Sequence, residues 1–193
     1  MIKYIKSKVG EIAVEFVVYD RWNELGSEKA SQINALLEIS FPPEERRSVE
    51  EIADNVNGPH LELLTAEENG NVYGMLTVWD LESFTFLEHF AVSPAYRGKG
   101  IGTKILDFVE EYWGKPTVLE VEYPTGRMEK RRIGFYERNS FVLNDYPYLM
   151  PDLSGGNEPV PLLLMSRPKA LEKPEKIAGL IYDIPYAGKV RPI

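Results

Sequence analysis

A glycine-rich stretch at residues 97–103 carries the residue types best suited to binding a charged ligand. It reads Arg97-Gly98-Lys99-Gly100-Ile101-Gly102-Thr103, with three glycines at alternate positions and two cations beside them. It lies between a predicted strand and a predicted amphipathic helix. Glycines let a backbone approach a ligand, and the free N–H groups and dipole of a helix start favour negative charge. The stretch therefore predicts a pyrophosphate-binding turn.

The glycine spacing separates this turn from two other phosphate-binding loops. A P-loop needs Gly-Lys-Ser/Thr five residues after its first glycine, but Thr103-Lys104-Ile105 stands there. The dinucleotide fingerprint needs a third glycine where Thr103 stands, although Glu120, about 20 residues further on, mimics its ribose-binding acid. A dinucleotide-binding protein is kept as the less favoured alternative.

Acidic residues within predicted strands are the candidates for proton transfer. Glu120 lies between apolar neighbours in a short strand, where partial burial would raise its pKa into a useful range. Glu122, two residues further on, would lie on the same face of the strand as Glu120. The rival is Glu88, because strand alternation places Glu88, Phe90 and Val92 on one face, with His89 on the opposite face.

Composition excludes several other classes of site. The chain has 193 residues and no cysteine, so it can form no disulfide, thiolate metal site or acyl-cysteine, and His60 and His89 are its two imidazoles. We expect no bound metal. A net charge of −8 is the wrong sign for a nucleic-acid binder. Without a signal-like apolar segment or a run of 18 apolar residues, the sequence predicts a soluble cytoplasmic protein with no membrane partner.

Hydrophobic periodicity and turn residues predict an α/β protein with a mixed sheet. The expected order is one or two strands within Met1–Tyr19, a helix from Ser27 with Ser27 as N-cap, a short helix from Ser48, strands at 60–66, 71–79 and 84–92, a helix at 100–113, a strand at 117–123, a helix at 128–139, and strands at 141–148 and 160–166. Ser48 and Glu51 match a capping box. The unit from Phe84 to Tyr123 should contain two parallel strands, and the charged run from Glu44 to Arg47 should be a solvated connection.

The run Arg97-x-x-Gly100-x-Gly102 after an Ala-Val-x-Pro strand end closely resembles the acetyl-coenzyme A (acetyl-CoA) loop of the GCN5-related N-acetyltransferases, the GNAT family. Phe135-Tyr136-Glu137 on the later predicted helix agrees with the same family, and the resemblance covers roughly His60 to Asp145. It implies a central, splayed mixed sheet flanked by helices. It also implies an N-acetyltransferase that moves the acetyl group of its cosubstrate acetyl-CoA to a primary amine in a ternary complex.

The resemblance further implies roles for particular residues. The strand end Phe90-Ala91-Val92 would bind the pantetheine arm, through the backbones of Phe90 and Val92, and the turn from Arg97 to Thr103 would hold the pyrophosphate. Tyr136 stands where the family has its general acid. The strand around Glu120 is similar to that of ribosomal-protein alanine acetyltransferases, in which the glutamate is the base. Glu88 remains the rival base.

Three further expectations concern the whole chain. We expect a single acetyltransferase domain at residues 1–167 and a C-terminal extension at 168–193. This extension would cover the site or a partner in a homodimer, two alternatives that the sequence leaves open. The acceptor would be a small-molecule or peptide amine, and the alternative function is a non-catalytic acyl-CoA-binding or sensor module of the same fold.

Overall fold

Eight strands form one mixed sheet in the computed structural model, which describes residues 3–9, 12–156 and 158–189. The strands are β1 (Lys3–Val9), β2 (Ile12–Tyr19), β3 (Leu61–Glu68), β4 (Asn71–Asp80), β5 (Thr85–Val92), β6 (Thr117–Glu122), β7 (Val142–Met150) and β8 (Val160–Arg167), in the spatial order β1-β2-β3-β4-β5-β6-β8-β7. Residues 1–2, 10–11 and 190–193, which belong to the predicted N-terminal strands and C-terminal extension, lie outside the described residues. The α/β fold class with a mixed sheet is confirmed.

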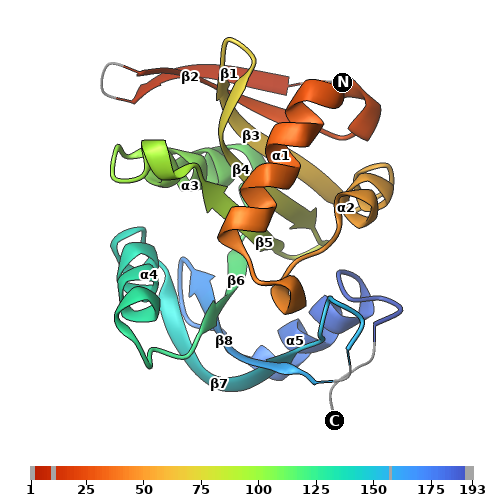
Figure 1. The fold of residues 1–193 in the computed structure, drawn as a ribbon. Helices are drawn as coiled ribbons and strands as arrows, with labels where there is room; N and C mark the ends of the chain where they lie inside the picture. Colours follow the sequence, from red (N-terminus) through yellow and green to blue (C-terminus); the bar gives the residue numbers. More distant parts are fainter. Residues whose placement is uncertain (1–2, 10–11, 157, 190–193) are drawn as a thin grey trace.

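All neighbouring strands run antiparallel except β5 and β6, which are parallel as predicted. Their pairing is short, since it consists of Thr85 with Thr117, Phe86 with Val118, and Leu87 with Leu119. Beyond these pairs the two strands diverge. In Figure 1 the first strands form the upper part of the molecule and β7 and β8 the lower part, with β5 and β6 joining them.

Five α-helices cover the two faces of this sheet. They are α1 (Ser27–Ser40), α2 (Val49–Val56), α3 (Ile101–Trp113), α4 (Arg127–Arg138) and α5 (Pro174–Asp183). Helices α1, α2 and α5 pack on one face through fully buried residues such as Ile33, Ile52 and Ile181. Helices α3 and α4 pack on the other face through Ile105 and Ile133. The sheet is therefore a central layer with a hydrophobic core on each side.

Local signals explain where the first two helices begin. The predicted capping box is confirmed, because the Glu51 N–H donates to Ser48 Oγ at 3.1 Å and the Ser48 N–H donates to Glu51 Oε2 at 3.1 Å. Ser27, however, is the first residue of α1 and not its N-cap. That position is held by Gly26, whose φ of 78° favours glycine.

The C-terminal segment packs into the body of the protein. Ala178 and Ile181 of α5 are buried in the same core as α1 and α2, and the Tyr182 hydroxyl donates to the Leu149 carbonyl of β7. Upstream of the helix, the Leu171 N–H donates to Asn144 Oδ1 at 2.7 Å. We infer that the described part of the predicted extension folds with the domain. Within the described ranges, no helix is both long and apolar enough to cross a membrane.

Candidate active site

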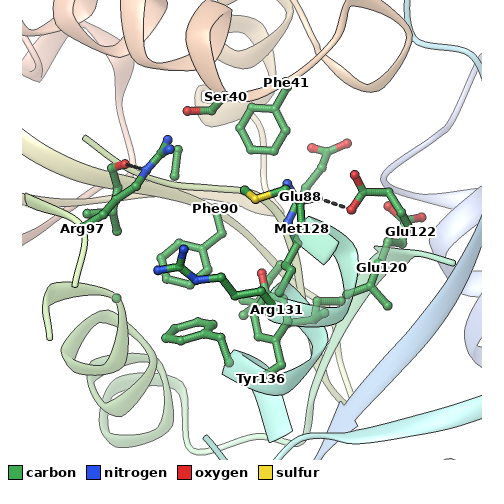
Figure 2. Close-up of a pocket in the computed structure, with 18 of the residues that line it drawn as sticks. Ser40, Phe41, Glu88, Phe90, Arg97, Glu120, Glu122, Met128, Arg131 and Tyr136 are labelled. Carbon is green, nitrogen blue, oxygen red and sulfur yellow. Dashed lines mark hydrogen bonds and ion pairs between the residues drawn. The ribbon is translucent and has the colours of Figure 1, made fainter. Parts of the chain in front are cut away.

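A cavity of about 750 Å³ lies where β5 and β6 diverge. It runs from the glycine turn at the start of α3 to a group of carboxylates on β5 and β6. Figure 2 shows Arg97 at one end, Glu88, Glu120 and Glu122 at the other, and Phe90 between them. The splay thus brings the predicted ligand turn and the predicted proton-transfer residues into one cavity.

The glycine turn has the backbone conformation that its sequence predicts. Gly98 and Gly100 have φ values of 76° and 87°, in the left-handed region, and a Cβ at Gly98 would meet nothing within 4 Å. Gly102 is needed for another reason, since a Cβ there would lie 3.2 Å from the ring of Phe135. Gly100 is the N-cap of α3 and supplies no side-chain cap, so the first N–H groups of the helix are free for a ligand.

The strand end before the turn presents an open edge to the cavity. The Ser93 N–H donates to the Tyr73 carbonyl of β4 at 2.8 Å, so the alternate backbone groups of Phe90 and Val92 face the splay. Arg97 Nε donates to the Val92 carbonyl at 2.9 Å, and Figure 2 marks this hydrogen bond of Arg97 with a dashed line. The backbone of Ala91 faces β4, where it pairs with Met75, and Ala91 lines the cavity.

The other turn residues differ in where their side chains lie. Thr103 lines the cavity. The Lys99 ammonium lies 4.8 Å from the centre of the Tyr96 ring, and Lys99 is not among the cavity-lining residues. Ile101 is buried in the core under α3. A contact of Lys99 or Ile101 with a ligand would therefore come from backbone N–H groups.

Glu88 lies on the other face of β5 from the one that alternation predicts. The β4–β5 register shifts where Thr77 stands opposite both Glu88 and His89, which is a β-bulge. Glu88 therefore contacts Trp79 and Arg47 on the face of α1 and α2, while Phe90 packs toward Tyr136 on the opposite face. The prediction that Glu88, Phe90 and Val92 share a face is wrong, because the bulge adds a residue to the strand.

The same bulge places His89 beside Glu88 and not opposite to it. The His89 Nδ1 atom lies 3.4 Å from Glu88 Oε2 and 3.3 Å from Thr77 Oγ1, and its Nε2 accepts from the Arg47 N–H at 3.3 Å. The His89 ring is 1% exposed and does not line the cavity. Its contacts indicate a structural role at the bulge.

The Glu88 carboxylate is held by fixed partners. Arg47 Nε donates to Oε1 at 2.9 Å and to Oε2 at 3.0 Å, and Trp79 Nε1 donates to Oε2 at 3.0 Å. Burial would raise the pKa of Glu88, but the Arg47 guanidinium, with His89, holds this pKa well below its usual range. Glu88 is consequently a charged, fully hydrogen-bonded group.

Glu120 has the opposite environment. Tyr186 Oη donates to Glu120 Oε2 at 2.8 Å, whereas the buried Oε1 has no hydrogen-bond partner among the described residues. Burial raises the pKa of Glu120 to about 8, an effect partly offset by the nearby hydroxyls of Tyr148 and Tyr186. Glu122 lies two residues further along β6. It is partly exposed and forms an ion pair with Arg132. Glu120 thus has a free oxygen and a pKa suited to proton transfer near neutral pH.

Tyr136 lies on the inner face of α4 and lines the cavity from the side of Phe90. It is 7% exposed and packs against Phe135 and Phe141. Burial raises the pKa of Tyr136 to about 12, so the phenol holds its proton at neutral pH. After this helix, Ser140 takes the left-handed conformation, with a φ of 65°.

Two residues that hold the carboxylates of the site were not found by sequence reasoning. Arg47 was expected to be solvated, but it is 3% exposed, and its guanidinium pairs with Glu88 and lies 5.4 Å from the rings of both Trp79 and Tyr186. Tyr186 comes from the predicted extension, about 66 residues after Glu120. No local spacing signals either contact, because each is made by folding distant segments together. Among the described residues, no group of three or more His, Asp or Glu side chains could hold a metal ion.

Comparisons with known proteins agree with this arrangement. The sequence profile described as the acetyltransferase (GNAT) family matches residues 30–141, more than half of the chain. A solved GNAT-family structure from Bacteroides thetaiotaomicron is 34% identical, with a TM-score of 0.73, and the match covers 81% of this chain and 90% of that one. The chain belongs to the GNAT acetyltransferase family, which confirms the resemblance and disfavours the dinucleotide-binding alternative.

Two further proteins are similar over smaller parts or at lower identity. The S-alkylcysteine N-acetyltransferase of Bacillus subtilis is 27% identical over 100 residues, which cover 44% of this chain and 55% of that protein, so the match spans about half of its length. An aminoglycoside 6'-N-acetyltransferase solved with coenzyme A shares the fold, with a TM-score of 0.58 at 15% identity over 76% of this chain and 94% of that one.

Proposed function

We propose that the protein transfers an acetyl group from acetyl-CoA to a small primary amine. The observation that carries the proposal is the single cavity that connects the glycine turn to the unpartnered oxygen of Glu120. Family membership supports the same chemistry, since the GNAT profile covers the turn, both diverging strands and the helix that carries Tyr136.

The residues of the turn and of β5 fit acetyl-CoA. The left-handed Gly98 and Gly100 and the uncapped start of α3 leave N–H groups for a pyrophosphate, with Arg97 beside them. The open edge at Phe90 and Val92 can pair with the amides of the pantetheine arm. Because Arg97 already occupies the Val92 carbonyl, the groups left for this pairing are the Val92 N–H and the backbone of Phe90.

Two side chains are suited to the proton transfers of this reaction. The amine nitrogen attacks the thioester carbonyl, a C–N bond forms, the C–S bond breaks, and coenzyme A leaves as a thiolate. Glu120 would take the proton that the ammonium must lose, because its pKa of about 8 is near that of many amines. Tyr136 would give a proton to the thiolate, since its phenol stays protonated at neutral pH. The chain has no cysteine that could carry an acetyl-cysteine intermediate, which supports direct transfer in a ternary complex.

Glu88 has a different role in this proposal. Its carboxylate accepts three hydrogen bonds from Arg47 and Trp79 and stays charged, which makes it a poor proton acceptor. It instead fixes Arg47 beneath the cavity and contributes to the raised pKa of Glu120 through like charge.

The mouth of the cavity favours an amine with an apolar substituent. Ile39 at the end of α1 and Met128 at the start of α4 are each 63% exposed and both line the cavity, together with Phe41. Large apolar side chains exposed at a cavity mouth are typical of ligand contacts. The B. subtilis relative is named for S-alkylcysteines, which combine an amine with an apolar chain.

The test is a screen of primary amines, with and without apolar groups, for release of free thiol from acetyl-CoA, with mass spectrometry of the acetylated product. We expect amine-dependent thiol release and faster turnover for amines that carry an apolar group. Calorimetry of acetyl-CoA binding accompanies the screen. Binding without turnover of any amine would favour the sensor alternative, and lack of binding would contradict both.

A further inference from the structure

The segment that follows α5 reaches the carboxylates of the cavity from outside the residues matched by the GNAT profile. Tyr186 lies two residues past Ile184, the C-cap of α5, and is 2% exposed. Its hydroxyl donates to Glu120 Oε2 at 2.8 Å. The profile match ends at residue 141, so this contact belongs to the C-terminal part of the chain and not to the matched region.

Several contacts hold the Tyr186 ring in place. The Arg47 guanidinium lies 5.4 Å from its centre, and the ring of Phe86 meets it edge to face at 6.2 Å. Arg47 also donates to the carbonyl of the preceding residue, Pro185, at 2.5 Å. Lys189 pairs with Glu51 of α2 at 2.5 Å, which ties the end of the segment to a helix on the same face of the sheet as α5. The hydroxyl therefore has a fixed direction toward Glu120.

Two buried oxygens lie next to this contact. Glu120 Oε1 and Tyr148 Oη are each buried without a hydrogen bond among the described residues. Because Tyr186 occupies Oε2, Oε1 is the oxygen of the carboxylate that remains for a proton from the cavity. A single hydrogen bond to one oxygen orients a carboxylate and leaves the other oxygen available to accept a proton.

We propose that Tyr186 is a positioning residue, which fixes the Glu120 carboxylate in the cavity through one hydrogen bond, so that the C-terminal segment completes the active site. The proposal rests on the proposed function, in which Glu120 accepts the proton of the amine. It assigns to Tyr186 no contact with the acceptor or with acetyl-CoA.

The groups that face Glu120 come from four elements. Tyr186 follows α5, Tyr148 belongs to β7, Glu88 to β5, and Glu45 to the short 3-10 helix Pro43–Glu45. Burial raises the pKa of Glu120 most and the two glutamates raise it further, while the nearby hydroxyls of Tyr148 and Tyr186 lower it, since they favour the charged form. Loss of the Tyr186 hydroxyl should therefore move this pKa further upward.

The experiment is Tyr186→Phe, which keeps the ring and its contacts with Arg47 and Phe86. In the pH profile of kcat/KM, the acid limb is the range in which activity rises as Glu120 ionises. We expect this limb to lie about one pH unit higher than in wild type, the size expected for one hydrogen bond to a charged group. Activity at pH 7 should fall by at least about tenfold, and by more than the rate on the high-pH plateau, where Glu120 is ionised in both proteins. A merely structural role would lower the rate at all pH values without moving the limb.

The matched control is Tyr182→Phe in α5, just before this segment. The Tyr182 hydroxyl donates to the Leu149 carbonyl, and its ring stacks on Tyr148 at 5.5 Å. It should leave the pH profile where it is in wild type. A limb that stays in place in Tyr186→Phe, or one that moves equally in Tyr182→Phe, would overturn the proposal.

A second readout separates this proposal from the proposed function. The carboxyl of Glu120 is titrated by carbon NMR in protein labelled at glutamate, and its signal is assigned by its loss in Glu120→Gln. We expect the signal to titrate at a higher pH in Tyr186→Phe than in wild type and Tyr182→Phe. Such a shift would support the contact even if no amine were acetylated, and an unmoved titration would refute it even if turnover were found.

Discussion

Glu88 and Glu120 hold matching places on β5 and β6, each directly after the last parallel pair, Leu87 with Leu119, yet their pKa values are displaced in opposite directions. The two buried carboxylates differ in their partners. Both oxygens of Glu88 accept from the charged Arg47 Nε, whereas Glu120 accepts from the neutral hydroxyl of Tyr186. The difference leaves Glu88 as a fixed charge and makes Glu120 the better candidate for the proton acceptor in the proposed reaction.

Gly100→Asp should abolish binding of acetyl-CoA. The new carboxylate would enter the turn where the pyrophosphate is expected, and Gly100 has a φ of 87°. The matched control is Gly114→Asp at the other end of α3, where φ is 61° and the backbone strain is similar. Calorimetry should show no binding in the first variant and near-wild-type affinity in the second. Equal affinity in both folded variants would remove the turn from the site.

Arg97→Ala should weaken acetyl-CoA binding less than Gly100→Asp, and the loss should shrink in high salt. At high salt, dissolved ions screen the attraction between the Arg97 guanidinium and the pyrophosphate in wild type. Removing the guanidinium therefore costs less affinity there. The control is Lys99→Ala, which removes the same charge from a side chain that lies over the Tyr96 ring. Titrations at low and high salt check both. An equal loss in the two variants at every salt concentration would show that the Arg97 position has no special role.

Tyr136→Phe should lower turnover by about 10²-fold, the size typical of a positioned acid, with little change in acetyl-CoA affinity. The substitution keeps the ring that packs between Phe135 and Phe141 and removes the donor alone. Steady-state kinetics and calorimetry measure the two effects separately. If turnover equals that of wild type across the pH range, Tyr136 serves packing and not proton transfer.

Arg47→Met should destabilise the fold by about 3 to 5 kcal/mol at neutral pH, because it leaves the buried carboxylate of Glu88 without its partner. The double variant with Glu88→Gln removes both charges and should recover much of this loss. Since the pKa of Glu88 is lowered on folding, its contribution is fully present above the ordinary pKa of 4.5 and is lost progressively as the pH falls from there toward the lower folded-state pKa.

Urea unfolding at pH 7 and pH 4 compares wild type with both of these variants. The wild-type advantage over the double variant should diminish at the lower pH. A single variant as stable as wild type would mean that the Arg47–Glu88 pair contributes little to the fold.

Local sequence signals predicted most of the fold and one half of the site. The glycine turn, the capping box at Ser48 and the parallel pair β5–β6 follow from residue types at short spacing. Glycine at a positive φ and a capping serine are needed whatever surrounds them, so a single sequence reveals them.

The acidic half of the cavity depends on contacts that short spacing does not encode. The bulge at Glu88 and His89 changes the face of the strand, and no residue type in β5 marks it in advance. Arg47 and Tyr186 reach the carboxylates from about 41 and 66 residues away. The relative pKa values of Glu88 and Glu120 follow from these contacts, and therefore could not be predicted from the strands alone.

The pH profile of kcat/KM in Glu120→Gln tests the central claim most directly. Because Glu120 can accept a proton only when it is ionised, wild-type activity should rise with pH to a plateau above about 8. The rise should occur at the same pH for acceptor amines of different pKa. In Glu120→Gln this limb should disappear and the plateau should fall by about 10²-fold. Glu122→Gln, on the same strand, should keep the limb. Full activity of Glu120→Gln at every pH, with a collapse in a folded Glu88→Gln, would show that the base lies on β5 and contradict the account.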